Sequence, residues 1–137
     1  MKKVVVASDS FKGCLSSAQV ADAVEKGIHE VYPECEVVKL GVADGGEGTL
    51  DVFRKTYGGT EITMTVDGPL VGQVEATYLI LHHGETAVIE MASACGLTLV
   101  PEDRRDPIKS TTYGLGQLIM DAIGRGCREV IVTLGGS

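Results

Sequence analysis

The sequence predicts an α/β protein that begins with parallel βαβ units and continues with mixed or antiparallel strands. Two β-branched apolar runs flank a single amphipathic segment in residues 2–42, as in a βαβ unit. Three strand-like runs then follow one another without a helix between them in residues 60–92. At 137 residues, the chain is long enough to bury a sizeable core.

The first elements alternate between strand and helix. Residues 2–8 (KKVVVAS) form a continuous apolar run of the kind that is buried in parallel sheets. Residues 16–33 predict a helix with Ser16 and Gln19 as a capping box and Pro33 as its stop. The apolar stripe of this helix consists of Val20, Val24, Ile28 and Val31.

A second strand is expected at residues 35–42, before the glycine-rich stretch ADGGEGT. Residues 49–59 predict a short helix that Gly58 ends. From Thr60 the alternation of strands and helices ends. Strand-like runs at 60–66, 72–81 and 86–92 are separated only by turn-rich segments. These runs predict a meander and a domain boundary near Gly59 to Gly72.

The last third returns to a helix and a strand. Pro101 and Pro107 forbid one long helix in residues 93–110, and a helical period resumes over 111–126. Gly114 and Gly116 lie inside that period, where they are expected to allow close packing or to delay the helix start. Residues 127–137 predict a closing strand and turn.

Composition and charge exclude several classes of partner. Nineteen acidic and twelve basic residues give a net charge of −7, the wrong sign for a surface that follows nucleic-acid phosphates. No apolar run approaches the roughly 18 residues of a membrane span, and no signal-peptide core follows Met1. We therefore expect a cytoplasmic protein without nucleic-acid or membrane partners. The four widely spaced cysteines form no zinc pattern and are expected to be reduced, mostly small core residues.

Polar side chains directly follow the first predicted strand. Asp9, Ser10 and Lys12 offer a carboxylate, a hydroxyl and an ammonium at the strand end, where ligands bind in open α/β sheets. A capped turn with a solvated Lys12 explains the same residues equally well.

The glycine-rich loop after the second predicted strand is another candidate. Gly45, Gly46 and Gly48 permit a close approach to an anion, and the next helix is expected to aim its amides there. Asp44 and Glu47 repel phosphate, which makes sense if a divalent cation lies between carboxylate and phosphate. A flexible turn is the alternative, because no complete phosphate-binding motif is present.

The closing strand runs into Gly135, Gly136 and Ser137, a turn that ordinarily cradles phosphate and opens a helix. Taken together, the three loops and the segments between them follow one family pattern in order. SDSFKGCLSS, VADGGEGT, IEMASACGLTLV, STTYGLGQL and VTLGGS resemble the bacterial glycerate kinase family along nearly the whole chain.

The resemblance implies an enzyme that uses ATP and Mg²⁺ to phosphorylate D-glycerate, mostly to 2-phosphoglycerate. It implies two domains, with residues 1–66 as the first part of a Rossmann-like α/β domain and 67–137 as the first part of an inserted mixed domain. The implied site residues fall into four sets: catalytic Asp9, Lys12 and Asp44; substrate-binding Ser10, Gly45, Gly46 and Glu47; ATP-binding Gly135, Gly136 and Ser137; and magnesium-binding Asp44 and Glu47.

Members of this family are far longer than 137 residues. The resemblance therefore implies an amino-terminal part of such an enzyme, inactive alone, that lacks its carboxyl-terminal half and tends to self-associate. A different class of function stays open from the residues themselves. It is a stand-alone, non-catalytic α/β domain that binds a small organic acid or phosphate.

Overall fold

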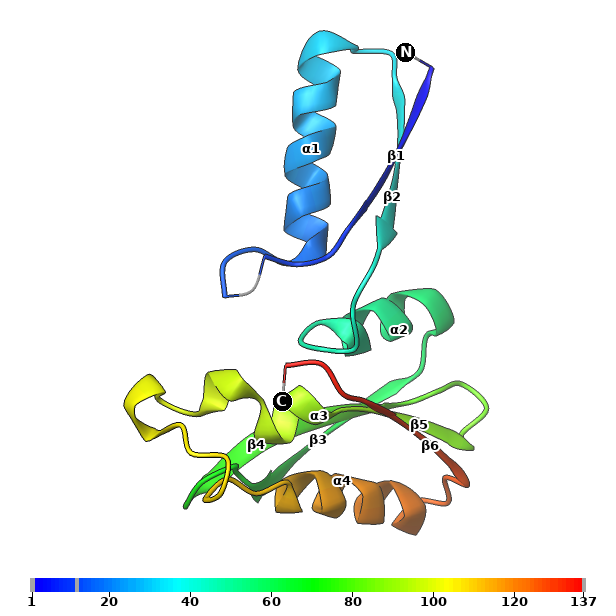
Figure 1. The fold of residues 1–137 in the computed structure, drawn as a ribbon. Coiled ribbons are helices and arrows are strands. Elements are labelled where there is room, and N and C mark those ends of the chain that lie inside the picture. The colour runs from blue at the N-terminus through cyan, green and yellow to red at the C-terminus, as the bar shows by residue number, and fades with distance from the viewer. Residues whose placement is uncertain (1, 12, 137) are drawn as a thin grey trace. The chain divides into compact units, whose positions relative to one another are not determined.

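A computed structural model describes residues 2–11 and 13–136 and divides into two compact units, Met1–Asp44 and Gly45–Ser137. Each unit has its own sheet (Figure 1). The first sheet has two parallel strands, and the second has four strands of mixed direction. This arrangement confirms the predicted fold class.

The first unit is a βαβ unit. Strands β1 (Lys3–Ser8) and β2 (Glu36–Gly41) pair in parallel and are connected by helix α1 (Ser17–Val31). The predicted capping box is present, because the Ser16 hydroxyl accepts from the Gln19 amide at 3.3 Å and the Gln19 side chain accepts from the Ser16 amide at 2.8 Å.

The predicted apolar stripe of α1 is covered only in part. Val20 is 7% exposed, whereas Val24 is 41% and Val31 is 68% exposed. The physical reason is the narrowness of the sheet, since two strands are too few to cover the whole apolar stripe of the helix.

The second unit holds the remaining elements. Its helices and strands are α2 (Thr49–Tyr57), β3 (Thr60–Asp67), β4 (Gln73–Ile80), β5 (Thr86–Glu90), α3 (Met91–Cys95), α4 (Tyr113–Gly124) and β6 (Glu129–Thr133). Two 3₁₀ turns lie at Leu97–Leu99 and Glu102–Arg104. The sheet order is β3-β4-β5-β6, with antiparallel pairing up to β5 and parallel pairing of β5 with β6.

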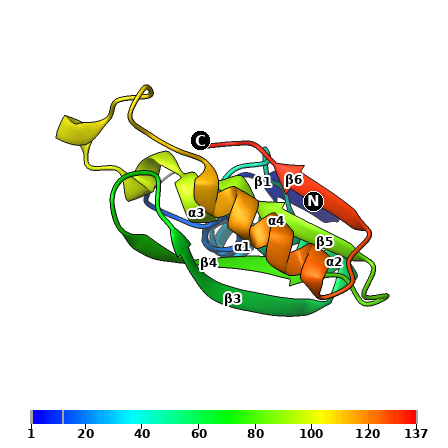
Figure 2. The same ribbon diagram turned by 90° about the horizontal axis from the view of Figure 1, so that it is seen from below.

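Helices α2 and α4 cover opposite faces of this sheet (Figures 1 and 2). On β5, Ala87 and Ile89 pack into the cluster that includes Leu118 of α4, whereas Val88 packs into the cluster of Leu50 in α2. This alternation follows from the two-residue period of a strand. It places Glu90, the last residue of β5, on the side of α2.

The domain boundary predicted between residues 66 and 67 lies inside β3, which pairs with β4 along its whole length. The chain instead divides into its two compact units after Asp44. As a boundary between the domains of a longer protein, the division at 66 stays a prediction.

Three of the four cysteines are buried, as expected, and all four are free thiols. Cys14 is the exposed one and lies in the segment between β1 and α1. Burial raises the pKa of the Cys95 thiol. Within residues 2–11 and 13–136, no helix combines the length and the apolar character needed to cross a bilayer.

Candidate functional site

Asp9 and Ser10 follow β1 in the first unit. Both are half-buried, and the Ser10 amide donates to Asp9 Oδ1 at 2.7 Å. The Ser17 hydroxyl donates to the Ser8 carbonyl at 2.6 Å and ties this turn to the start of α1. The local bonds of a capped turn are therefore present alongside the candidate carboxylate. Lys12 lies outside the described residues.

Asp44 follows β2 and is exposed. The last register pair of the first sheet is Ser8 with Gly41, so Asp9 and Asp44 both come after the carboxyl end of that sheet. This is the end at which open α/β sheets bind ligands.

The glycine-rich loop Gly45–Gly48 opens the second unit. Gly45 and Gly48 have φ values of +95° and +94°, in the left-handed region that favours glycine. The Thr49 hydroxyl donates to the Gly46 carbonyl at 2.8 Å. Gly46 is buried, and Glu47 is exposed. The loop is thus an ordered turn that presents Glu47 to solvent.

The structure brings this loop against the turn after β6. The Gly135 amide donates to the Gly45 carbonyl at 2.8 Å. A Cβ added at Gly135 would overlap the backbone nitrogen of Gly46, so the two backbones are in direct contact. The Gly136 carbonyl accepts from the Leu97 amide at 2.9 Å. The predicted substrate-binding glycines Gly45 and Gly46 therefore lie against Gly135 of the predicted ATP-binding turn. The predicted Ser137 lies outside the described residues.

Glu90 belongs to the same corner, although it is not among the site residues that the resemblance implies. Its side chain is buried, and its Oε2 accepts from the amides of Gly48 at 3.1 Å and Leu50 at 3.0 Å. Burial raises the pKa of Glu90; the amides of Leu50 and Gly48 act in the opposite direction, and the negative charge of Glu47 adds to the rise.

This contact corrects one sequence-based expectation. The first amides of α2 were expected to face an external anion, but Glu90 of the chain itself accepts from them. A signal was present in the sequence, because Glu90 directly follows the apolar residues Ala87, Val88 and Ile89, and the structure buries every residue of this strand. A carboxylate in such a place requires hydrogen-bond donors nearby.

Thr133 is the register partner of Glu90 and ends β6. Its Oγ1 is buried without a hydrogen-bond partner in the part of the chain that the structure describes. A Cβ added at Gly45 would lie 3.9 Å from the Thr133 Cβ, so this hydroxyl group belongs to a residue beneath the glycine loop.

The predicted magnesium ligands are the carboxylates of Asp44 and Glu47. Among residues 2–11 and 13–136, no group of three or more His, Cys, Asp or Glu side chains is arranged to hold a metal. Magnesium takes one or two carboxylates in kinases and completes its shell with water and substrate phosphates. Each of these carboxylates has the donor chemistry that Mg²⁺ takes, and a magnesium ion held by both stays a prediction.

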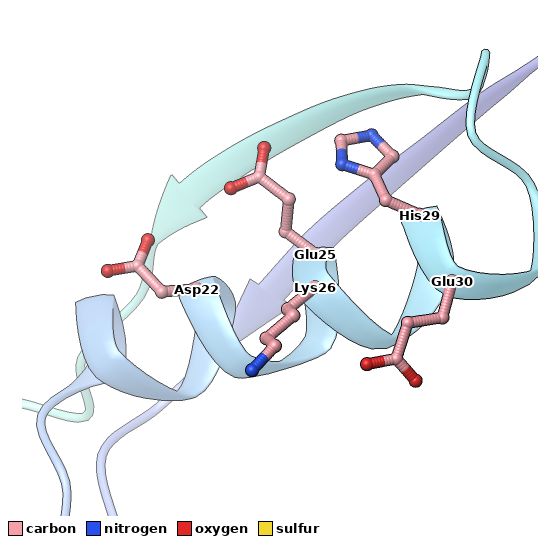
Figure 3. A pocket seen from close by; sticks show the side chains of 5 residues that line it. All are labelled: Asp22, Glu25, Lys26, His29 and Glu30. Atoms are coloured by element: carbon pink, nitrogen blue, oxygen red, sulfur yellow. The ribbon is translucent and has the colours of Figure 1, made fainter.

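A shallow hollow lies on the surface of α1 (Figure 3). It is lined by Asp22, Glu25, Lys26, His29 and Glu30. Asp22 and Glu25 are already paired with Lys39 at 2.8 and 2.7 Å. His29 Nε2 lies 2.9 Å from the Cys35 carbonyl. This hollow is a solvated polar helix face.

Comparisons with known proteins agree with the resemblance. A family model described as the glycerate kinase family matches residues 4–137. The chain is 45% identical over 135 residues to the glycerate 2-kinase of Escherichia coli strain K12 and, over the same length, 45% identical to the glycerate kinase of Bacillus subtilis strain 168. Both alignments cover 98% of this chain and 35% of the relative.

A solved structure gives the same result for the fold. The crystal structure described as a candidate glycerate kinase 2 from Salmonella typhimurium LT2 aligns with a TM-score of 0.73 and 42% identity. The alignment covers 99% of this chain and 36% of that one. The chain thus spans about a third of the length of the relatives that it matches.

Proposed function

The chain belongs to the glycerate kinase family, and we propose that it supplies the amino-terminal part of an enzyme that transfers a phosphoryl group from ATP to D-glycerate and forms 2-phosphoglycerate. The extent of the match is the observation that carries the proposal. Relatives named glycerate kinases align with nearly the whole chain, including each of its three candidate loops.

The residues after β1 and β2 are proposed to act on the acceptor. Asp9 or Asp44 orients or deprotonates the attacked hydroxyl of D-glycerate, and Ser10 contributes a hydroxyl to substrate binding. Lys12 pairs with the glycerate carboxylate or with the phosphoryl group in transfer. The position of Asp9 and Asp44 after the carboxyl ends of two parallel strands supports these roles.

The corner formed by the two glycine turns is proposed to serve the phosphates. Gly45 and Gly46 leave the backbone approachable where Gly135 contacts them. Gly135, Gly136 and Ser137 are proposed to bind the phosphates of ATP. Asp44 and Glu47 would hold Mg²⁺. When bound, the ion offsets the negative charge that accumulates on the phosphoryl oxygens.

The 137-residue chain is proposed to be inactive by itself, because it covers 35% of the length of the relatives that are named glycerate kinases. It would depend on the remainder of such an enzyme or associate with itself. The free thiols fit the reducing cytoplasm, which we propose as its location.

Lys12 provides the test of the proposed chemistry. In a chimera, residues 1–137 replace the aligned part of the E. coli glycerate 2-kinase, and D-glycerate-dependent ADP release from MgATP is measured. Replacing Lys12 with Met is expected to lower kcat/KM by about two decades or more, because a cation that neutralises developing charge is lost.

The matched control is Lys26→Met. Lys26 is an exposed lysine of α1 that lines the surface hollow, so the same substitution there should leave kcat/KM within about twofold. Equal kinetics for the wild-type chimera and the Lys12→Met chimera would remove Lys12 from the mechanism.

A further inference from the structure

The glycine-rich loop is held by a buried side chain that is distant in sequence. Glu90 lies 42 residues after Gly48 and 40 residues after Leu50, and it accepts from both amides through the same oxygen. Glu90 is 7% exposed and follows four buried residues of β5. A buried carboxylate is costly unless donors satisfy it, so the strand and the loop stabilise each other.

The loop is held from a second side by the turn after β6. Gly135 donates to Gly45 and is in backbone contact with Gly46. Since Glu90 and Thr133 form the last register pair of β5 and β6, both attachments start from the same end of two neighbouring parallel strands. The residues on either side of Glu47 are therefore fixed while its own side chain is exposed.

From this geometry we infer that Glu90 is a positioning residue of the active site, whose carboxylate oxygen fixes the Gly45–Gly48 loop and with it Glu47. The inference rests on the proposed function, in which this loop binds the substrate and a metal. It assigns Glu90 neither proton transfer nor contact with the substrate.

Two conservative variants separate this positioning role from a role of the negative charge. Glu90→Gln keeps an oxygen acceptor at the same reach and removes the charge, whereas Glu90→Asp keeps the charge and withdraws the oxygens by one methylene. A positioning role predicts that Glu90→Gln keeps the loop protected and the enzyme active, whereas Glu90→Asp does not. A role as charge or base predicts the reverse.

The first readout is amide hydrogen exchange of the 137-residue chain. Gly48 and Leu50 are expected to lose about tenfold or more of their protection in Glu90→Asp and Glu90→Ala, and to stay within about threefold in Glu90→Gln. Amides that pair β3 with β4 report whether each variant is folded. If Glu90→Ala does not fold, the comparison of Gln with Asp still decides.

Glu129 supplies the matched control. It is also a carboxylate on this strand pair, where Glu129 accepts from the Thr86 hydroxyl at 2.7 Å, but it lies at the opposite end from Glu90. Glu129→Gln and Glu129→Ala should leave the exchange of Gly48 and Leu50 unchanged. Equal loss of protection in the Glu129 variants would mean a general loss of stability and would overturn the inference.

The second readout is the kinetics of the chimera, measured well below the unfolding midpoint of every variant. Glu90→Asp and Glu90→Ala are expected to lower kcat/KM for D-glycerate by about tenfold or more, and Glu90→Gln by less than about threefold. A Gln variant as impaired as the Ala variant would overturn the positioning role. An inactive wild-type chimera would instead contradict the proposed function, and the exchange comparison would still decide on Glu90.

Discussion

Asp121 links helix α4 to strand β4 through Tyr78 and also pairs with Arg125 at the end of its own helix. The Tyr78 hydroxyl, which belongs to a fully buried side chain, donates to Asp121 Oδ2 at 2.6 Å, and Arg125 Nε donates to the same oxygen at 2.7 Å. Arg125 first and Tyr78 second hold the pKa of Asp121 below its ordinary value. The ionised carboxylate is therefore the form that stabilises the folded unit.

The sign of the resulting pH dependence follows from linkage. Because the folded pKa of Asp121 is lowered, its contribution is fully present above the unfolded value of about 3.9 and is lost as the pH falls through the folded value. Asp121→Asn should lower the free energy of unfolding by about 1 kcal/mol at pH 7. Its difference from the wild type should shrink as the pH is lowered below about 4.

Urea unfolding at several pH values measures this difference, and Asp103→Asn in the exposed 3₁₀ turn is the matched control. A difference between Asp121→Asn and the wild type that stays constant from pH 7 to pH 3 would contradict the assignment. The Asp103 control is expected to change the free energy of unfolding by less than about 0.5 kcal/mol at either pH.

At the scale of single residues, the sequence located candidate site residues better than it predicted the groups that contact them. Asp9, Asp44 and the glycines were identified because turn residues directly after strands have local signatures. Glu90 and Thr133 were not. Glu90 contacts amides forty or more positions away, and the Thr133 hydroxyl has no hydrogen-bond partner among the described residues. No local pattern contains that information.

At the scale of elements, α4 shows why two glycines in one helix differ. A Cβ added at Gly114 would overlap the Asp67 carbonyl, so this glycine lets the helix approach the end of β3. Gly116 is exposed, and nothing lies within 4 Å of an added Cβ there. Close packing, one of the two expected roles, therefore applies to Gly114 alone.

Alanine substitutions at these two glycines are predicted to change the free energy of unfolding in opposite directions. Gly116→Ala should raise the free energy of unfolding by about 0.5–1 kcal/mol, because alanine loses less backbone entropy in a helix. Gly114→Ala should lower it by about 1–3 kcal/mol, because the helix must move away from β3. Denaturant unfolding of both variants measures the effects, and a destabilised Gly116→Ala would show that the space beside it is occupied.

Most elements were predictable, since periodicity and capping are local. The capping box of α1, the end of α2 at Gly58 and the three strands of the meander all agree with the sequence analysis. The short helix α3 was missed, since its five residues are too few to establish a helical period. Its first two residues were assigned to the strand at 86–92 and the other three to the segment 93–110. The partial cover of α1 was also missed, because it depends on the width of a sheet.

At the scale of the whole molecule, the mixed sheet joins segments that sequence analysis could only order along the chain. The parallel pairing of β5 with β6 spans α3, both 3₁₀ turns and α4. That pairing brings the turn at Gly135 against the loop at Gly45. The family resemblance implied the chemistry, but the contact between these two turns could be seen only in the folded structure.

The central claim is that this chain can supply the amino-terminal part of a glycerate kinase active site. The most direct measurement is D-glycerate-dependent ADP release by the wild-type chimera, with the 137-residue chain alone and the parental E. coli enzyme assayed in parallel. We predict a kcat/KM for the chimera within about tenfold of the parent and no turnover by the chain alone. A folded chimera that binds MgATP yet releases no ADP in response to D-glycerate would contradict the account.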